Sequence, residues 1–149
     1  MQLKQKIHAV CLQVVNKKIE ALQNTLQELG EGALSDGKSS AGDKHETARA
    51  MMQLEQEKIS RQLDELLIQK AALQKIDITL ISTQITKGSL VKTNKGYLFL
   101  SIALGKLMVD SVGIIVLSPQ SPLGLKLMGL QAKSSVEINT VTYLIEEVF

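Results

Sequence analysis

Two long segments without proline or glycine make up much of the first half of this chain, and a stretch rich in glycine and serine separates them. The first segment runs from Gln2 to about Leu29, and the second from Asp43 to about Lys75. Apolar residues recur in both at steps of three, four or seven, which is the spacing of a narrow coiled-coil seam. The seam residues are Leu12, Val15, Ile19, Leu22, Leu26 and Leu29, and then Met52, Ile59, Leu63, Leu66 and Leu73. We therefore expect two long helices. A further stripe at Leu3, Ile7, Val10 and Val14 predicts that the first helix also packs on a domain.

The separating stretch, Gly30 to Gly42, predicts a turn between the helices. It combines four glycines with serine and aspartate, which favour turns. If the helices fold back antiparallel, a single register pairs Leu29 with Met52, Leu22 with Ile59, and Val15 with Leu66. The sequence thus predicts an antiparallel coiled-coil hairpin over residues 1–75, with its tip near residues 35–46.

The period of the apolar residues changes after Lys75, and residues 76–149 predict a small α+β domain. A short turn, Asn94-Lys95-Gly96, joins two of the expected strands. Ser121 suits a helix N-cap and Pro122 the first helical position, while Gly129 suits the helix end. The expected strands are Ser89–Thr93, Tyr97–Leu104, Val112–Leu117, Ser135–Ile138 and Thr140–Val148, and the expected helix is Leu123–Met128. We expect a mostly antiparallel sheet with one short helix.

Composition limits the classes of function. The net charge is +2, from 17 basic and 15 acidic residues, which does not favour direct binding of nucleic acid. Cys11 is the single cysteine, so no internal disulfide is expected and a reducing compartment is favoured. No apolar run approaches the roughly 20 residues of a membrane span, and no signal peptide is evident. We expect a soluble, cytoplasmic protein with no contact to a membrane.

Two motifs resemble the Gre family of bacterial transcription elongation factors, and the resemblance covers essentially the whole chain. The first motif is Gly42-Asp43-Lys44-His45-Glu46-Thr47-Ala48, where a glutamate follows Gly-Asp by three residues at the start of the second helix. The second, more specific motif is Leu117-Ser118-Pro119-Gln120-Ser121-Pro122-Leu123-Gly124, which leads into the short helix and its closing Gly129.

The resemblance implies an FKBP-like second domain that docks on RNA polymerase and a coiled coil that enters the polymerase's secondary channel. It implies that Asp43 and Glu46 are the tip acids that help hold a second catalytic Mg²⁺ in the polymerase active site, where backtracked transcripts are cleaved. Under this interpretation the chain is an accessory factor and not itself an enzyme. It has no cofactor of its own, binds nucleic acid only through the elongation complex, and is expected to be monomeric. The residues expected to contact the partner are Lys44, His45, Arg49, Ser118, Pro119, Ser121 and Pro122.

Structural interpretations of the same residues stay open. Asp43 and Glu46 also fit a capping box at a helix start. Lys44, His45 and Arg49 also fit a solvated helix face, while Ser118, Ser121 and Pro122 fit a helix start with no activating base nearby.

Three other functions remain to be separated from transcript cleavage. The nearest is a secondary-channel regulator that does not stimulate cleavage. A prolyl isomerase is disfavoured because the second domain has few aromatic residues for such a pocket, namely Tyr97, Phe99, Tyr143 and Phe149. A coiled-coil adaptor outside transcription is the third.

Overall fold

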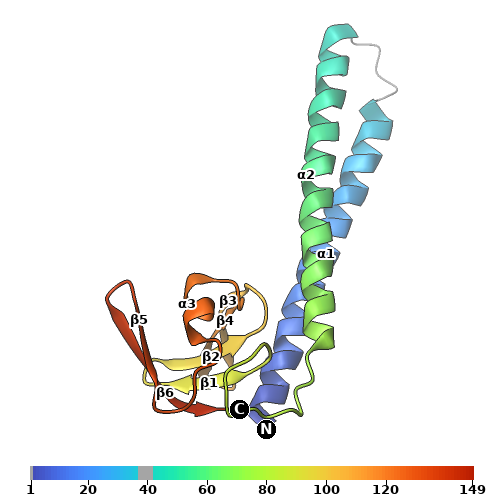
Figure 1. The fold of residues 1–149 in the computed structure, drawn as a ribbon. Helices are drawn as coiled ribbons and strands as arrows, with labels where there is room; N and C mark the ends of the chain where they lie inside the picture. Colours follow the sequence, from blue (N-terminus) through green and yellow to red (C-terminus); the bar gives the residue numbers. More distant parts are fainter. Residues whose placement is uncertain (1, 37–41) are drawn as a thin grey trace. The chain divides into compact units, whose positions relative to one another are not determined.

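The structure, a computed structural model, describes the chain over residues 2–36 and 42–149, with side chains for 2–31 and 46–149. Two long helices come first, followed by six strands and one short helix (Figure 1). The protein therefore belongs to the α+β class. Its elements are α1 (Gln2–Asp36), α2 (Gly42–Lys75), β1 (Leu90–Thr93), β2 (Gly96–Leu100), β3 (Gly105–Val109), β4 (Val112–Leu117), α3 (Pro122–Leu127), β5 (Ser135–Ile138) and β6 (Val141–Val148).

The chain forms two compact units. One, here called the hairpin unit, is Gln13–Lys70 and contains most of α1 and α2. The other, here called the sheet unit, joins Met1–Leu12 to Ala71–Phe149. The first turns of α1 and the last residues of α2 thus group with the sheet. The domain boundary that the sequence predicts between residues 75 and 76 stays a prediction.

In the hairpin unit, α1 and α2 lie side by side and run in opposite directions (Figure 1). Val15 and Ile19 of α1 and Ile59 of α2 are buried. Leu22, Leu26 and other seam positions further along are half-buried, so burial follows the three-and-four spacing of the sequence. Burial of one apolar stripe on each helix is what stabilises a two-helix pair, because isolated long helices are only marginally stable in water. The coiled-coil pairing and its register stay predictions.

The first helix is longer than the sequence pattern indicated. We expected it to end near Leu29, but α1 continues through Gly30 and Gly32 to Asp36. A glycine in a helix interior destabilises it by only about 1 kcal/mol relative to alanine, and the flanking residues Glu28, Glu31 and Ala33 are compatible with helix. The rest of the predicted turn, residues 37–41, lies outside the described part of the chain.

The sheet of the second unit has strand order β3-β4-β2-β1-β6-β5. Neighbouring strands are antiparallel except β2 and β4, which pair in parallel from Tyr97↔Ile114 to Leu100↔Leu117. The parallel pair exists because β3 (Gly105–Val109) forms a hairpin with β4 at the edge of the sheet. The expectation of a mostly antiparallel sheet with one helix is confirmed.

Side chains on both faces of this sheet are buried. One face carries Leu98, Leu100 and Leu117, which form the core with Leu127 of α3. The opposite face carries Phe99, Ile114 and Val116, each at most 1% exposed. Figure 1 shows the first turns of α1 beside these strands, and the Lys6 ammonium on α1 pairs with the Asp110 carboxylate in the β3–β4 turn at 2.7 Å. The stripe of α1 on this side is therefore the one through Ile7 and Cys11, both fully buried, whereas Leu3, Val10 and Val14 are only half-buried.

One strand prediction was wrong, and one strand was missed. The predicted strand Tyr97–Leu104 is β2, and it ends at Leu100. The next residues turn, with Gly105 at φ +81°, into β3, which the sequence analysis did not identify. The other strands and the short helix α3 lie within one or two residues of their predicted bounds.

Two strand-joining turns place residues other than glycine at positive φ. Asp110 and Ser111 join β3 to β4, and Asn139 and Thr140 join β5 to β6, with φ between 50° and 67°. Two-residue hairpin turns require this conformation at both positions. Asparagine tolerates it, but a β-branched residue such as Thr140 does not adopt it readily, so this turn is strained.

Among the residues that the structure describes, no helix is both long and apolar enough to span a bilayer.

The strain at Thr140 predicts that Thr140→Gly stabilises the sheet unit. Glycine adopts φ +67° without the clash of Cβ, so the free energy of unfolding should rise by about 1 kcal/mol. Urea unfolding followed by circular dichroism measures this change. The control Thr142→Gly lies in β6 at an ordinary strand position and should lower the free energy of unfolding by about 0.5–1 kcal/mol. Equal effects of the two variants would contradict the assignment of strain.

The buried position of Cys11 predicts a slowly reacting thiol. Burial raises the pKa of Cys11 to about 12, so only about one ten-thousandth of the thiol is ionised at pH 8. Reaction with Ellman's reagent at pH 8 should therefore be at least about a hundredfold slower in the folded protein than in urea. Rapid reaction of the folded protein would show that the first turns of α1 do not stay packed in the sheet unit.

Candidate functional sites

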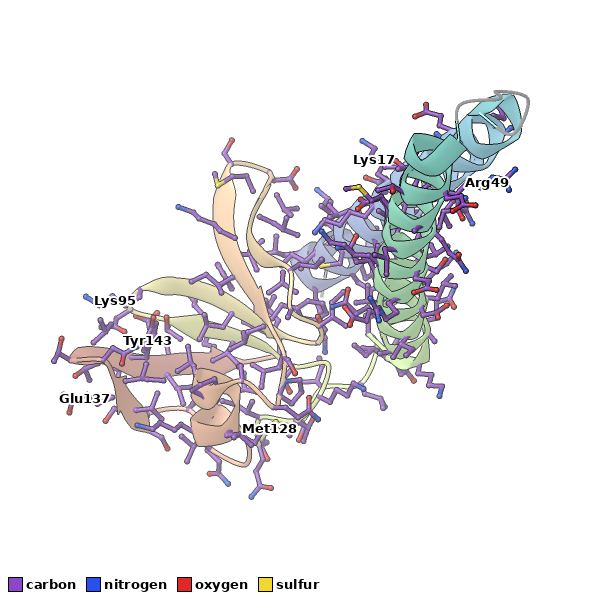
Figure 2. All side chains as sticks on the ribbon, turned by 90° about the horizontal axis from the view of Figure 1, so that it is seen from above. Lys17, Arg49, Lys95, Met128, Glu137 and Tyr143 are labelled. Atoms are coloured by element: carbon purple, nitrogen blue, oxygen red, sulfur yellow. The ribbon has the colours of Figure 1, made fainter. Side chains whose placement is uncertain are left out.

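The first candidate site is the start of α2, where the sequence placed two acids. The helix begins at Gly42, so the backbone of Asp43 lies in its first turn and Glu46 follows three residues later. Residues three apart on a helix are neighbours on one face. Glu46 and Arg49 are exposed, and Figure 2 shows Arg49 projecting outward from α2.

The side chains of Asp43, Lys44 and His45 lie outside the described residues, and the roles of these residues stay predictions. The predicted capping box needs Asp43 at the N-cap, but α2 begins one residue earlier, at Gly42, so Asp43 occupies the first helical turn. An acid there still interacts favourably with the positive end of the helix dipole. The backbone spacing is thus compatible with a structural and with a functional role at once.

The residue types of this pair are ones that can bind magnesium. Mg²⁺ is usually held by one or two carboxylates together with water and phosphate oxygens. Asp43 and Glu46 can supply two carboxylates from one helix face. Within the described side chains, no group of three or more His, Cys, Asp or Glu residues is placed to hold a metal ion.

The second candidate site is the segment Ser118 to Pro122, whose hydroxyls are engaged in local hydrogen bonds. The Ser121 hydroxyl donates to the Ser118 carbonyl at 2.7 Å and accepts from the Gly124 amide at 3.1 Å, which makes it the N-cap of α3. The Ser118 hydroxyl donates to the Gln120 side chain at 2.7 Å and accepts from the Gln120 amide at 3.1 Å. These bonds show that both serines shape the helix start, as expected from the sequence.

The prolines of this segment differ in exposure. Pro119 is buried, while Pro122, at the first position of α3, is exposed. Close by on α3, Leu125 is 65% exposed and Met128 lies at the helix end (Figure 2). The surface near Pro122 is therefore partly apolar. The contact with a partner that was predicted for Ser118, Pro119, Ser121 and Pro122 stays a prediction.

A third group of residues was not predicted. Lys4 is only 1% exposed, and its ammonium donates to the Leu80 carbonyl at 2.9 Å and to the backbone oxygen of Phe149 at 3.2 Å. Burial lowers the pKa of Lys4, and the negative charge of Asp77 opposes that shift. The helical spacing could have indicated that Lys4 is buried, because Lys4, Ile7 and Cys11 share one stripe of the helix. A lysine is usually exposed, however, so the spacing alone did not single it out.

His8 has a structural role in the sheet unit. Its Nε2 lies 2.7 Å from the Leu73 carbonyl oxygen. A carbonyl only accepts, so Nε2 carries the proton and donates. This bond ties α1 to the last turn of α2.

Gly124 of α3 cannot be enlarged without displacing the segment before it. A Cβ at this position would lie 2.2 Å from the Ser118 carbonyl oxygen, a backbone atom. Gly124→Ala should therefore lower the free energy of unfolding of the sheet unit by about 2 kcal/mol or more, measured by urea titration. The control Gly30→Ala meets no atom within 4 Å inside α1 and should stabilise the hairpin unit by about 0.5–1 kcal/mol. A neutral Gly124→Ala would show that the Ser118–Gly124 turn is not held as described.

Comparison with known proteins yields no match to a family model, to a curated protein or to a solved structure. The resemblance to the Gre family therefore rests on the two motifs in the sequence.

Proposed function

We propose that this protein is an accessory factor of bacterial RNA polymerase that stimulates cleavage of backtracked transcripts. The hairpin enters the secondary channel of the polymerase and brings Asp43 and Glu46 to the catalytic magnesium site. The polymerase performs the cleavage, and the factor contributes carboxylates. Such a factor works as a monomer in the cytoplasm and meets nucleic acid only within the elongation complex.

One observation carries the proposal: a helical hairpin whose second helix begins at Gly42 with acids in its first turns. In the hairpin unit, α1 ends at Asp36 and α2 starts six residues later, so the beginning of α2 belongs to the end of the hairpin where the chain turns back. The exposed Glu46 and the backbone of Asp43 lie within this end. An FKBP-like identity of the sheet domain is part of the same proposal.

The proposed chemistry needs no covalent step by the factor. In a two-metal site, one ion activates the attacking water and the other stabilises the leaving oxygen. Two further carboxylates lower the free energy of the second ion at the polymerase site and can orient the water. The rim contact is assigned to Ser118–Pro122 in the sheet unit, with Lys44, His45 and Arg49 near phosphates or acids of the channel.

Removing both charges tests the proposal. Asp43→Asn with Glu46→Gln keeps the shape of the side chains but removes two metal ligands. Release of 3′ fragments from stalled, backtracked elongation complexes should slow by about tenfold or more, equivalent to about 1.4 kcal/mol in the barrier. The rate is measured with end-labelled RNA, with and without the factor.

The matched control is Glu57→Gln with Asp64→Asn, which removes two exposed acids further along α2. Elongation complexes with this variant should release 3′ fragments at the rate seen with the wild-type factor. Wild-type protein that releases no additional fragment, yet competes with another secondary-channel factor for polymerase, would identify a regulator that does not stimulate cleavage. A cleavage rate that is the same in the tip variant and in wild type would exclude the assigned role of the acids.

A further inference from the structure

A short stretch of the loop between α2 and β1 lies open on the surface of the sheet unit. It covers residues 80–83, which belong to no helix or strand. Two large apolar side chains in it, Leu80 and Ile81, are 68% and 65% exposed. Adjoining exposed apolar side chains mark surfaces that contact a partner. The proposed function assigns no role to this stretch.

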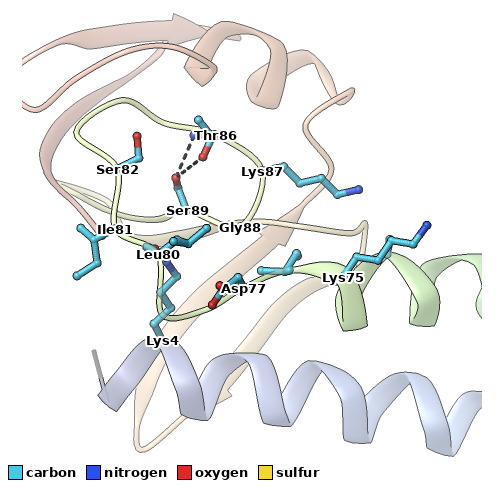
Figure 3. A pocket seen from close by; sticks show the side chains of 12 residues that line it. Lys4, Lys75, Asp77, Leu80, Ile81, Ser82, Thr86, Lys87, Gly88 and Ser89 are labelled. Atoms are coloured by element: carbon cyan, nitrogen blue, oxygen red, sulfur yellow. Dashed lines mark hydrogen bonds between the residues drawn. The ribbon is translucent and has the colours of Figure 1, made fainter.

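The stretch is fixed at its first residue. The buried ammonium of Lys4 donates to the Leu80 carbonyl at 2.9 Å, and Figure 3 shows Lys4 reaching from α1 to the loop at this point. The Leu80 amide donates to the Asp77 carbonyl at 3.3 Å. Both backbone groups of Leu80 are therefore used within the protein. A segment that is fixed before binding loses less conformational entropy when a partner arrives.

The next three residues leave their backbone groups open. Within the part of the chain that the structure describes, the amides of Ile81, Ser82 and Thr83 donate to no other residue and their carbonyls accept from none. The Ser82 hydroxyl accepts from the Gln84 amide at 3.3 Å, which is a bond of the side chain only. Open amides and carbonyls in a row can pair with an extended segment of another protein, as happens when a strand is added to a sheet edge.

Two hollows border the stretch. One, of about 460 Å³, is lined by residues 80–82 and by Ile76, and the other, of about 230 Å³, is lined by Thr83 and Val148. All these residues belong to the sheet unit. Side chains two apart on an extended segment point to the same side. A segment that pairs with residues 81–83 can therefore place alternate side chains in the two hollows.

Exposed positive charge lies beside the larger hollow. Lys75 and Lys87 line it and are both exposed, and Figure 3 shows them extending away from Lys4, on the side opposite to Ile81. Among the side chains that the structure describes, neither lysine forms an ion pair. The other two charges of the lining, Lys4 and Asp77, attract each other. Acids on a partner segment would therefore meet the two exposed lysines separately.

We propose that this stretch binds an extended segment of a partner protein, with apolar residues at alternate positions and acidic residues at the end near the lysines. Its backbone pairs with residues 81–83, and its apolar side chains cover Leu80 and enter the two hollows. Its carboxylates contact Lys75 and Lys87, while Lys4 only holds the loop. The inference does not depend on the proposed function, because its test needs no polymerase.

A capped heptapeptide with two glutamates at each end and Val-Thr-Val between them is a suitable probe, because it offers acids in either direction of pairing. Titrated into the full-length protein, it should bind saturably with a Kd of about 1 mM or tighter. The largest NMR shifts, and slower exchange of the amides with solvent, should occur at residues 81–83.

Two control peptides separate the contributions of charge and backbone. One has lysine in place of every glutamate, and the other is N-methylated at its three central residues, which removes their backbone donors. Each should bind at least about tenfold more weakly than the probe. Absence of saturable binding of the probe, or equal binding of either control peptide, would overturn the proposal.

The apolar contact is tested by Leu80→Ala with Ile81→Ala, which truncates two exposed side chains. It should weaken binding of the probe by about fivefold or more. The matched control, Met108→Ala with Leu125→Ala, truncates two side chains of the sheet unit that are 60% and 65% exposed, and should leave binding unchanged. Equal losses in the two pairs would contradict the assignment of the apolar contact.

The lysines are tested in the same way. Lys75→Gln with Lys87→Gln should weaken the probe by about fivefold or more and should leave the N-methylated peptide bound no more tightly than before. Lys95→Gln with Lys106→Gln removes two exposed lysines elsewhere in the sheet unit and should not change binding. An equal loss in both lysine pairs would show a nonspecific effect of charge and would refute the assigned contacts.

Discussion

Burial of one stripe of α1 is the constraint on which both compact units depend. Ile7 and Cys11 on this stripe are fully buried in the sheet unit, and Val15 and Ile19 continue it as buried residues of the hairpin unit. The steps between them are four, four and four, which stay on one side of a helix over this short length. A fully buried Ile contributes about 1.5–3 kcal/mol, so a polar substitution within this stripe removes a large part of the stability of either unit. Residues of α1 thus contribute buried side chains to each of the two compact units.

The elements that the sequence predicted correctly are those defined by residues close together in the chain, such as helix caps and turns. Ser121 and Pro122 define the start of α3 by a cap and a fixed φ, and the structure has both in these roles. The Asn139–Thr140 turn was recognisable because two strand-like runs flank it, although Thr140 itself is unfavourable at positive φ. These features depend on contacts within a few residues, which a single sequence contains.

The features that the sequence did not predict depend on contacts between residues that are distant in the chain. The strand β3 follows β2 without a proline or an early glycine, so Tyr97–Leu104 resembled one continuous strand. In the structure β4 pairs with both β2 and β3, and these pairings join residues distant in the sequence. Lys4 is buried because backbone oxygens of Leu80 and Phe149, 76 and 145 residues away, accept from its ammonium. Of the candidate sites, the sequence therefore indicated the helix start at Asp43 and the turn at Ser118, but not the buried Lys4.

Asp43 and Glu46 supply only two carboxylates, which limits what this pair can bind alone. Two carboxylates on one helix face leave most positions around a magnesium ion to water, so Asp43 and Glu46 make at most a weak site until other ligands are added. Polymerase acids and transcript phosphates would supply those ligands, which is why a role for this pair implies a partner. The proposed chemistry of the tip can therefore be studied only together with such a partner.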